Sequence, residues 1–254
     1  MDCKKALEES SGDFEKAVEI LRKKGQKVAA NRADRESSEG VVLAKVSDDN
    51  TYGIIISLNC ETDFVAKNEE YIQLAQSLAS HALNYSDKDS LLNSEFEGMK
   101  VSDKLLEQTG VIGEKIEIGS FEYLESEFVG SYIHAGSKIA SIVGLSEKFD
   151  NANEVSKDIS MQVAAMNPVA LDENGVSQEI IEKEIEIAKD QLRQEGKPEE
   201  MLDNIAKGKL KKFFKENTLV NQQFIKDNKQ SISDYLKSKS ENASVTGFAR
   251  IGLV

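Results

Sequence analysis

The chain has 254 residues, enough for one large domain or two modest ones that each bury a core. Its formal charge of -13 repels phosphate-rich surfaces, so direct binding to nucleic acid is disfavoured. No apolar run approaches the ~20 residues that span a bilayer, and no secretory signal follows Met1, so we expect a soluble protein of the cytoplasm with no membrane contact.

Residues 1–25 are predicted to form two short helices. Asp13 is a suitable N-cap for the second helix, and Gly25 is a suitable C-terminal stop. Two short helices cannot enclose a core, so this part either leans on the rest of the chain or lacks a helix. Residues 26–39 are polar without periodicity, which predicts a linker. One apolar face of the second helix is formed by Phe14, Ala17, Val18 and Leu21.

The pattern then changes from helices to strands. Residues 41–46 and 52–58 are rich in β-branched side chains and flank a turn-forming segment, which predicts a β-hairpin. Apolar side chains at helical spacing follow over residues 65–82. After these we expect an acidic loop, a helix at residues 101–108 and a strand at residues 114–124.

The same order of elements repeats in the second half of the chain. Residues 128–134 and 138–145 are predicted to form a second hairpin, and a second helix ends at Pro168, which cannot continue it. A helix at residues 232–239 and a strand at residues 244–254 follow. The repeat predicts two related α+β subdomains, each an antiparallel sheet with helices on one face.

The two core subdomains are predicted at residues 40–126 and 127–254. The second contains an insertion, at about residues 177–216, of two charged helical stretches split by the tripeptide Gly-Lys-Pro at 196–198. Apolar residues of the two stretches face each other across this break. We therefore expect an antiparallel coiled-coil hairpin that projects from the body.

Few residues could carry catalysis. His81 and His134 are the two histidines, and neither stands in a motif for nucleophilic catalysis, so both are interpreted as structural. Cys3 and Cys60 make neither a disulfide framework nor a zinc site and are interpreted as packing residues. The sequence lacks the glycine motifs that cradle nucleotide phosphates. We therefore expect no catalytic centre, no cofactor and no metal ion.

Residues 60–66 read Cys-Glu-Thr-Asp-Phe-Val-Ala and lie between the first hairpin and its helix. From composition alone, Thr62 or Asp63 is an ordinary helix N-cap and Phe64 an ordinary core residue. The segment nevertheless resembles the Cys-x-Thr-Asp-Phe-Val-Ala signature of the elongation factor Ts family. Residues 1–7, Met-Asp-Cys-Lys-Lys-Ala-Leu, resemble the signature of that family's N-terminal ubiquitin-associated-like (UBA-like) domain. Two such heptapeptides in the family's order make the resemblance specific.

The resemblance implies a UBA-like helical module at residues 1–25, followed by the two core subdomains and the protruding coiled coil. Family members usually begin with one more helix before the Asp-Cys-Lys-Lys segment, and this sequence lacks it. The module is therefore expected to be partial.

The resemblance also implies a guanine nucleotide exchange factor with no bond chemistry of its own. The family binds elongation factor Tu carrying GDP, displaces Mg²⁺ and promotes GDP release so that GTP can bind. Carried onto this chain, Phe64 is an apolar wedge between partner helices, and Asp63 disturbs the water network around the partner's magnesium ion. Thr62 and Val65 hold these two side chains in place.

Further contacts with elongation factor Tu are implied for two other segments. Contacts with its GTPase domain are implied for Asp2, Cys3, Lys4 and Lys5. Contacts with a more distant domain are implied for Met161, Gln162 and Val163. The family commonly has His at the position of Gln162, which puts a contact through that position in doubt. The residues leave open whether two copies pair as a homodimer through the coiled coil.

Two other classes of protein stay open at this stage. A non-catalytic adaptor on the same scaffold would bind the partner without accelerating nucleotide release. A hydrolytic or transfer enzyme is disfavoured, because the sequence shows no convergent set of titratable residues.

Overall fold

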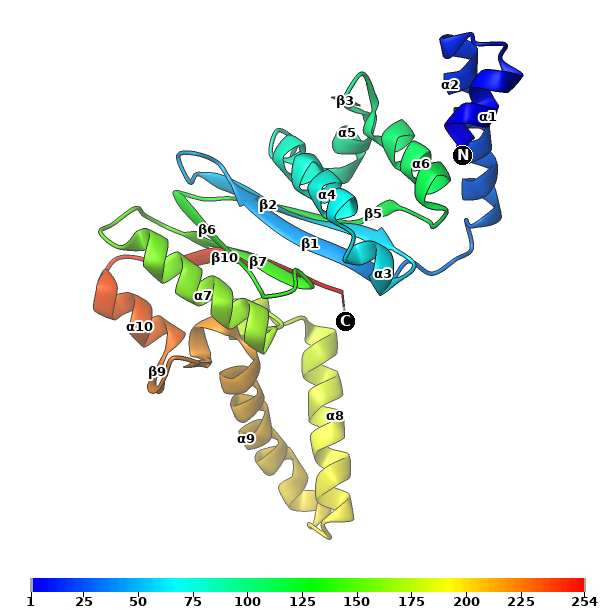
Figure 1. The fold of residues 1–254 in the computed structure, drawn as a ribbon. Coiled ribbons are helices and arrows are strands. Elements are labelled where there is room, and N and C mark those ends of the chain that lie inside the picture. Colours follow the sequence, from blue (N-terminus) through cyan, green and yellow to red (C-terminus); the bar gives the residue numbers. More distant parts are fainter. Residues whose placement is uncertain (1, 254) are drawn as a thin grey trace.

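Two antiparallel sheets of three strands lie at the centre of the molecule, whose computed structural model describes residues 2–253 (Figure 1). The first sheet has the order β1 (Glu39–Val46), β2 (Tyr52–Cys60), β5 (Glu117–Glu125). The second has the order β10 (Val245–Gly252), β7 (Ile139–Leu145), β6 (Phe128–Ile133). In both sheets the second strand along the chain is central, and the third strand carries a β-bulge against it. This shared topology confirms the predicted repeat; of the predicted last strand, position 254 lies outside the described residues.

The two sheets pack face to face, and helices cover their outer faces (Figure 1). Helices α4 (Glu69–Ala82) and α6 (Val101–Ile112) lie over the first sheet, and α7 (Ala152–Met166) and α10 (Ile232–Lys239) lie over the second. The seam between the sheets is formed by Val42, Ala44, Ile55, Val129, Ala140, Ile142 and Ile251. A strand covered on both faces must be apolar on both, which explains why β2 buries nearly every residue.

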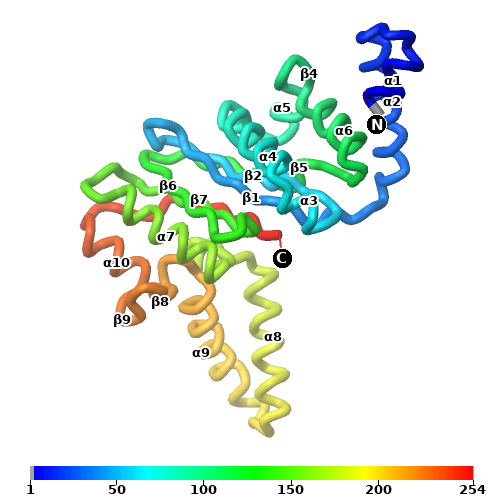
Figure 2. The backbone as a smooth tube through the Cα atoms, in the orientation of Figure 1, coloured from blue at the N-terminus to red at the C-terminus, as the bar shows by residue number. Residues whose placement is uncertain are grey.

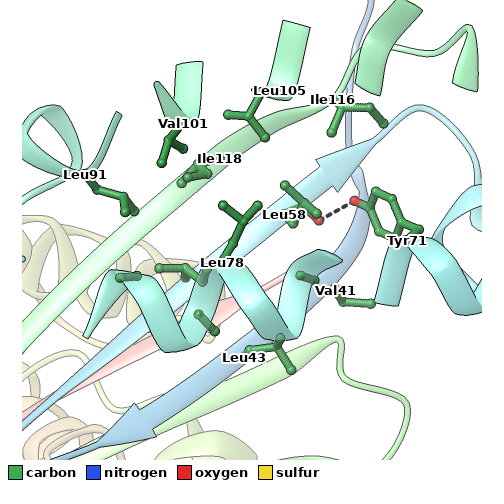
Figure 3. Packing of buried hydrophobic residues seen from close by; sticks show 14 of the residues in the cluster. Val41, Leu43, Leu58, Tyr71, Leu78, Leu91, Val101, Leu105, Ile116 and Ile118 are labelled. Atoms are coloured by element: carbon green, nitrogen blue, oxygen red, sulfur yellow. Dashed lines mark hydrogen bonds between the residues drawn. The ribbon is translucent and has the colours of Figure 1, made fainter. Parts of the chain in front are cut away.

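The core of the first subdomain lies between its sheet and α4 (Figure 3). Leu78 of α4 packs onto the strands, while the buried Tyr71 donates a hydrogen bond of 2.7 Å from its hydroxyl to the carbonyl oxygen of Leu58. The helix expected at residues 65–82 is in fact two helices. A one-turn helix, α3 (Asp63–Ala66), precedes α4, because the side chain of Asn68 accepts the hydrogen bonds that start a new helix.

The N-terminal helices α1 (Asp2–Glu9) and α2 (Phe14–Asn31) pack against each other, and α2 also packs against α6. Asp13 caps α2 as predicted. The predicted stop at Gly25 is wrong, since α2 continues through it to Asn31, and the linker expected from residue 26 begins only after that helix.

Gly25 lies inside α2 because it forms a close helix crossing with Gly110 of α6. A Cβ on Gly110 would lie 2.6 Å from the Cα of Gly25, so no side chain fits between the two backbones. Tertiary packing here outweighs the cost of a mid-helix glycine, about 1 kcal/mol. The helix pair therefore leans on the first subdomain, which is one of the two options left by the sequence.

The predicted coiled-coil hairpin is present as α8 (Gln178–Gln194) and α9 (Glu199–Asn217), which project from the body (Figure 2). Buried Ala188 and Leu192 of α8 pack toward buried Leu202 and Ala206 of α9. Hydrogen bonds close its base: the backbone N–H of Val169 donates to Asn217, and that of Leu219 donates to Ala170.

Several short elements were not predicted. The segment expected to be an acidic loop contains a helix and a small hairpin, α5 (Lys88–Asn93), β3 (Glu95–Phe96) and β4 (Met99–Lys100). The second subdomain adds the turns η1 (Glu173–Gly175) and η2 (Leu219–Asn221) and the hairpin β8 (Gln223–Phe224) and β9 (Asp227–Ser231). Such short pieces carry too few residues for a periodic signal. Across residues 2–253, none of the helices combines the length and apolarity needed to cross a membrane.

The helix crossing is testable by adding one methyl group. Gly110→Ala should lower the free energy of unfolding by about 1–3 kcal/mol, because the new Cβ meets the Gly25 backbone. Gly208→Ala, on the exposed face of α9 with open space around it, is the matched control and should raise that free energy by up to about 1 kcal/mol. Urea unfolding followed by circular dichroism measures both. Equal effects would contradict the close crossing.

Candidate functional site

The segment that follows β2 forms a single helical turn beyond the end of the sheet. β2 ends at Cys60, and Thr62 caps α3 by accepting a hydrogen bond of 3.5 Å from the N–H of Val65. Ala66 is buried and Val65 packs against the first core, so one side of the turn is anchored. The other side, which carries Asp63 and Phe64, faces outward.

Two glutamates cross-link the residues before α3 to the start of β5. One carboxylate oxygen of Glu114 accepts the backbone N–H groups of Glu61 and Thr62 at 3.1 and 3.0 Å, and the other accepts the Thr62 hydroxyl at 2.7 Å. In return, the Glu61 carboxylate accepts the backbone N–H of Lys115 at 2.7 Å and binds Arg32 with both oxygens. Glu61 is thereby held both through its backbone, by Glu114, and through its side chain, by Lys115 and Arg32.

The electrostatics of Glu61 follow from these partners. Desolvation raises the pKa of its carboxyl, but the N–H of Lys115 and the guanidinium of Arg32 outweigh this, so the pKa of Glu61 lies below its usual value. Arg32 follows the last residue of α2. The ion pair therefore also ties the N-terminal helix pair to the segment before α3.

Phe64 is the most exposed large apolar side chain of this region. It is 83% exposed, and Val111 at the end of α6 is 74% exposed. Both line a hollow of about 360 Å³, whose wall includes Val65, Tyr71 and Ile112. An aromatic side chain held in water by a fixed turn loses its burial energy unless a partner covers it, which is typical of a contact surface.

Asp63 stands beside Phe64 as a charged group. The ammonium of Lys67, one turn on, donates to its carboxylate at 2.6 Å, and this hydrogen bond and charge hold the pKa of Asp63 below its usual value. The site thus offers an ionised carboxylate next to an exposed ring. Within residues 2–253 no group of three or more His, Cys, Asp or Glu side chains is arranged to hold a metal ion.

The structure places two of the three residues predicted on α7 in the interior. Gln162 and Val163 are fully buried, so neither side chain can be touched from outside. The Gln162 amide donates to Gln222 at 3.0 Å and to the backbone oxygen of Gln223 at 3.1 Å, and it accepts the N–H of Ile225 at 2.9 Å. Its role is to fix the segment around β8. Partly exposed Met161 lines a hollow of about 400 Å³ together with His134.

The residues predicted on α1 lie on its surface. Cys3, Lys4 and Lys5 are exposed, which corrects the expectation that Cys3 packs in a core. The side chain of Asp2 lies outside the described part of the chain. Cys60 is buried as expected, and burial raises the pKa of its thiol. None of the described side chains of α1 or α7 lines the hollow beside Phe64, so the three predicted segments present separate described surfaces.

Four residues of the site were not predicted from the sequence: Arg32, Glu61, Val111 and Glu114. Glu61 stands inside the recognised heptapeptide, but its neighbours Thr62 and Asp63 were the obvious caps. Nothing in the spacing of Arg32 or Glu114 indicates that they meet Glu61, because the contacts span 29 and 53 residues.

Comparisons with known proteins agree with the architecture. The family model described as "Elongation factor TS" matches residues 61–253, from Glu61 of the site to the end of the last strand. The chain belongs to the elongation factor Ts family. The elongation factor Ts of Christiangramia forsetii is 64% identical over 253 residues, which is 100% of this chain and 92% of that protein.

Two further elongation factor Ts proteins show how far the similarity extends. That of Flavobacterium psychrophilum is 60% identical over 253 residues, covering 100% of this chain and 92% of its own. That of Porphyromonas gingivalis is 46% identical over 256 residues with the same coverage of both chains. The match to elongation factor Ts therefore includes the N-terminal helices as well as the two subdomains.

The structural role of Gln162 predicts a stability effect. Gln162→Ala should lower the free energy of unfolding by about 1–3 kcal/mol, because the buried side-chain oxygen of Gln222 and the N–H of Ile225 lose their partner. Lys157→Ala, on the exposed face of the same helix, should change it by less than about 0.5 kcal/mol. Urea unfolding compares the two. A Gln162→Ala protein as stable as the Lys157→Ala control would show that the buried network contributes nothing.

Proposed function

We propose that the chain is a guanine nucleotide exchange factor of translation elongation, which acts in the cytoplasm on elongation factor Tu carrying GDP. Membership of the elongation factor Ts family supports this role. The observation that carries it is Phe64, a large apolar side chain that is 83% exposed on an anchored turn. Such a side chain is built to enter a pocket on another protein.

The exchange reaction needs no bond chemistry from this chain. Phe64 enters between two helices of the partner, and the ionised Asp63 beside it faces the water network of the partner's magnesium ion. That ion neutralises phosphate charge on the bound GDP, so displacing it weakens the nucleotide. Thr62 and Val65 act from behind, one as the cap of the turn and the other as its anchor in the core.

Exchange of this kind is a linked equilibrium. A protein that binds the nucleotide-free shape of its partner more tightly lowers the partner's affinity for GDP. By the same factor, bound GDP lowers the partner's affinity for that protein. GTP then fills the emptied site and releases the exchange factor. Phe64 and Asp63 contribute only in so far as their contacts differ between the two shapes of the partner.

Two other surfaces are proposed to extend the contact. The helix pair at residues 2–31 is the UBA-like module, and exposed Lys4 and Lys5 on α1 meet the GTPase domain of elongation factor Tu. Met161 beside its hollow meets a more distant domain. In the complex, two copies pair through α8 and α9, a role supported by exposed Ile187 and Met201 on these helices.

The release rate of a fluorescent GDP analogue from elongation factor Tu tests the proposal. The intact chain should accelerate release strongly, and Phe64→Ala should reduce the acceleration by about tenfold or more, which corresponds to about 1.4 kcal/mol or more at a contact hot spot. Val169→Ala, which truncates an exposed apolar side chain after α7 outside the proposed contacts, is the matched control and should act like the intact chain.

Two outcomes would contradict the proposal. Binding of elongation factor Tu without accelerated release would favour the non-catalytic adaptor. Unchanged acceleration by the Phe64→Ala protein would leave the exchange role standing and remove the wedge from its mechanism.

A further inference from the structure

Glu114 is a carboxylate that the proposed mechanism does not use. It follows Gly113, whose left-handed backbone with φ of 84° ends α6, and it precedes β5. Its two oxygens accept three hydrogen bonds, and all three donors belong to Glu61 and Thr62. All the described hydrogen bonds of this carboxylate are therefore with the two residues that lead into α3.

We propose that Glu114 is a positioning residue for nucleotide exchange, which sets the direction in which α3 presents Phe64 and Asp63 to the partner. This inference rests on the proposed exchange function. Glu114 does not touch the partner in this scheme, and it acts through Thr62.

The turn that carries Phe64 cannot orient itself. α3 has four residues. A single helical turn is unstable on its own, because its first hydrogen bond contributes less free energy than the ordering of the backbone costs. Its cap is weak as well, since the Thr62 hydroxyl lies 3.5 Å from the N–H of Val65. The same hydroxyl donates to Glu114 at 2.7 Å, a shorter, charge-assisted hydrogen bond. Glu114 is thus the stronger constraint on the cap.

The chemistry of the contact selects a carboxylate. All three groups that face Glu114 are donors, and an ionised carboxylate is acceptor-only. A glutamine oxygen can keep both N–H contacts, but its NH₂ group would then face the Thr62 hydroxyl, which would have to turn from donor to acceptor and lose its charge-assisted hydrogen bond. Glu114→Gln is therefore a nearly isosteric change that should loosen the turn.

The rest of the cross-link keeps the segment in place when Glu114 is altered. The Glu61 carboxylate still binds Arg32 and the N–H of Lys115, and Val65 still packs in the core. We expect the fold to persist and the turn to sample more directions. A loosened turn has to be ordered when the partner binds. This costs free energy that the fixed turn does not lose, so the rate of exchange falls.

A double-mutant cycle separates positioning from simple stability. GDP release from elongation factor Tu is measured with the intact chain, Glu114→Ala, Glu114→Gln, Phe64→Ala and the double variant Glu114→Ala with Phe64→Ala. Glu147→Ala is the matched control, because this carboxylate accepts the Ser240 hydroxyl in the other subdomain, away from the hollow. Thermal unfolding of each variant reports the folded fraction.

The expected result is a loss of about tenfold in acceleration for Glu114→Ala, a smaller loss for Glu114→Gln, which keeps the two N–H contacts, and none for the control. In the Phe64→Ala background, Glu114→Ala should cause a clearly smaller loss, because only Asp63 is left to position. A purely structural effect would instead lower the rate by the same factor in both backgrounds, and that result would overturn the proposal.

Failure of the inference differs from failure of the proposed function. If the intact chain accelerates release and the Glu114 variants match it, only the positioning role falls. If the intact chain does not accelerate release, the exchange function falls and the role of Glu114 falls with it.

Discussion

The packing of one sheet on the other is the interaction on which the remaining layers depend. It covers side chains from all six central strands, such as Val42 and Ile55 on one side and Val129 and Ile142 on the other. Each subdomain alone would leave this apolar face of its sheet in water, and such a face has to be buried against another element. The seam therefore makes a single body from two repeats.

The position of the candidate site follows from that arrangement. Because both faces of β2 are covered, its end at Cys60 is a fixed point, and α3 begins three residues later. β5 pairs with β2 and starts beside the same end, which brings Glu114 and Glu61 together. The exposed ring of Phe64 is thus attached to the end of a strand that is buried on both faces, although it lies on a short turn. A contact surface gains from such support, because less order has to be created on binding.

The sequence predicted the elements with long periodic patterns. Both central hairpins, α7 with its end before Pro168, the projecting helical hairpin and α10 follow from local apolar spacing and from turn residues, and they were found. Apart from the short elements and the helix break at Asn68, the failures share one cause, which is contact between distant segments. Gly25 was interpreted as a stop, since its partner Gly110 cannot be inferred from local pattern. The heptapeptide located Phe64, whereas the exposure of that side chain and its support by Glu114 depend on the fold. Gln162 shows the same limit, because its burial under the β8 segment is invisible in its helix.

The way the helical hairpin is joined to the body has an evolutionary consequence. The start of α8 and the end of α9 join the body side by side. The hydrogen bonds of Val169 with Asn217 and of Leu219 with Ala170 hold these two ends together. The structure of the body consequently depends on the hydrogen-bonded base of the hairpin and not on its more distant part. Whole helical turns can be gained or lost in matched pairs along α8 and α9 while the sheets and the turn of Phe64 stay unchanged. The length of this arm is therefore free to diverge between lineages under selection separate from that on the rest of the protein.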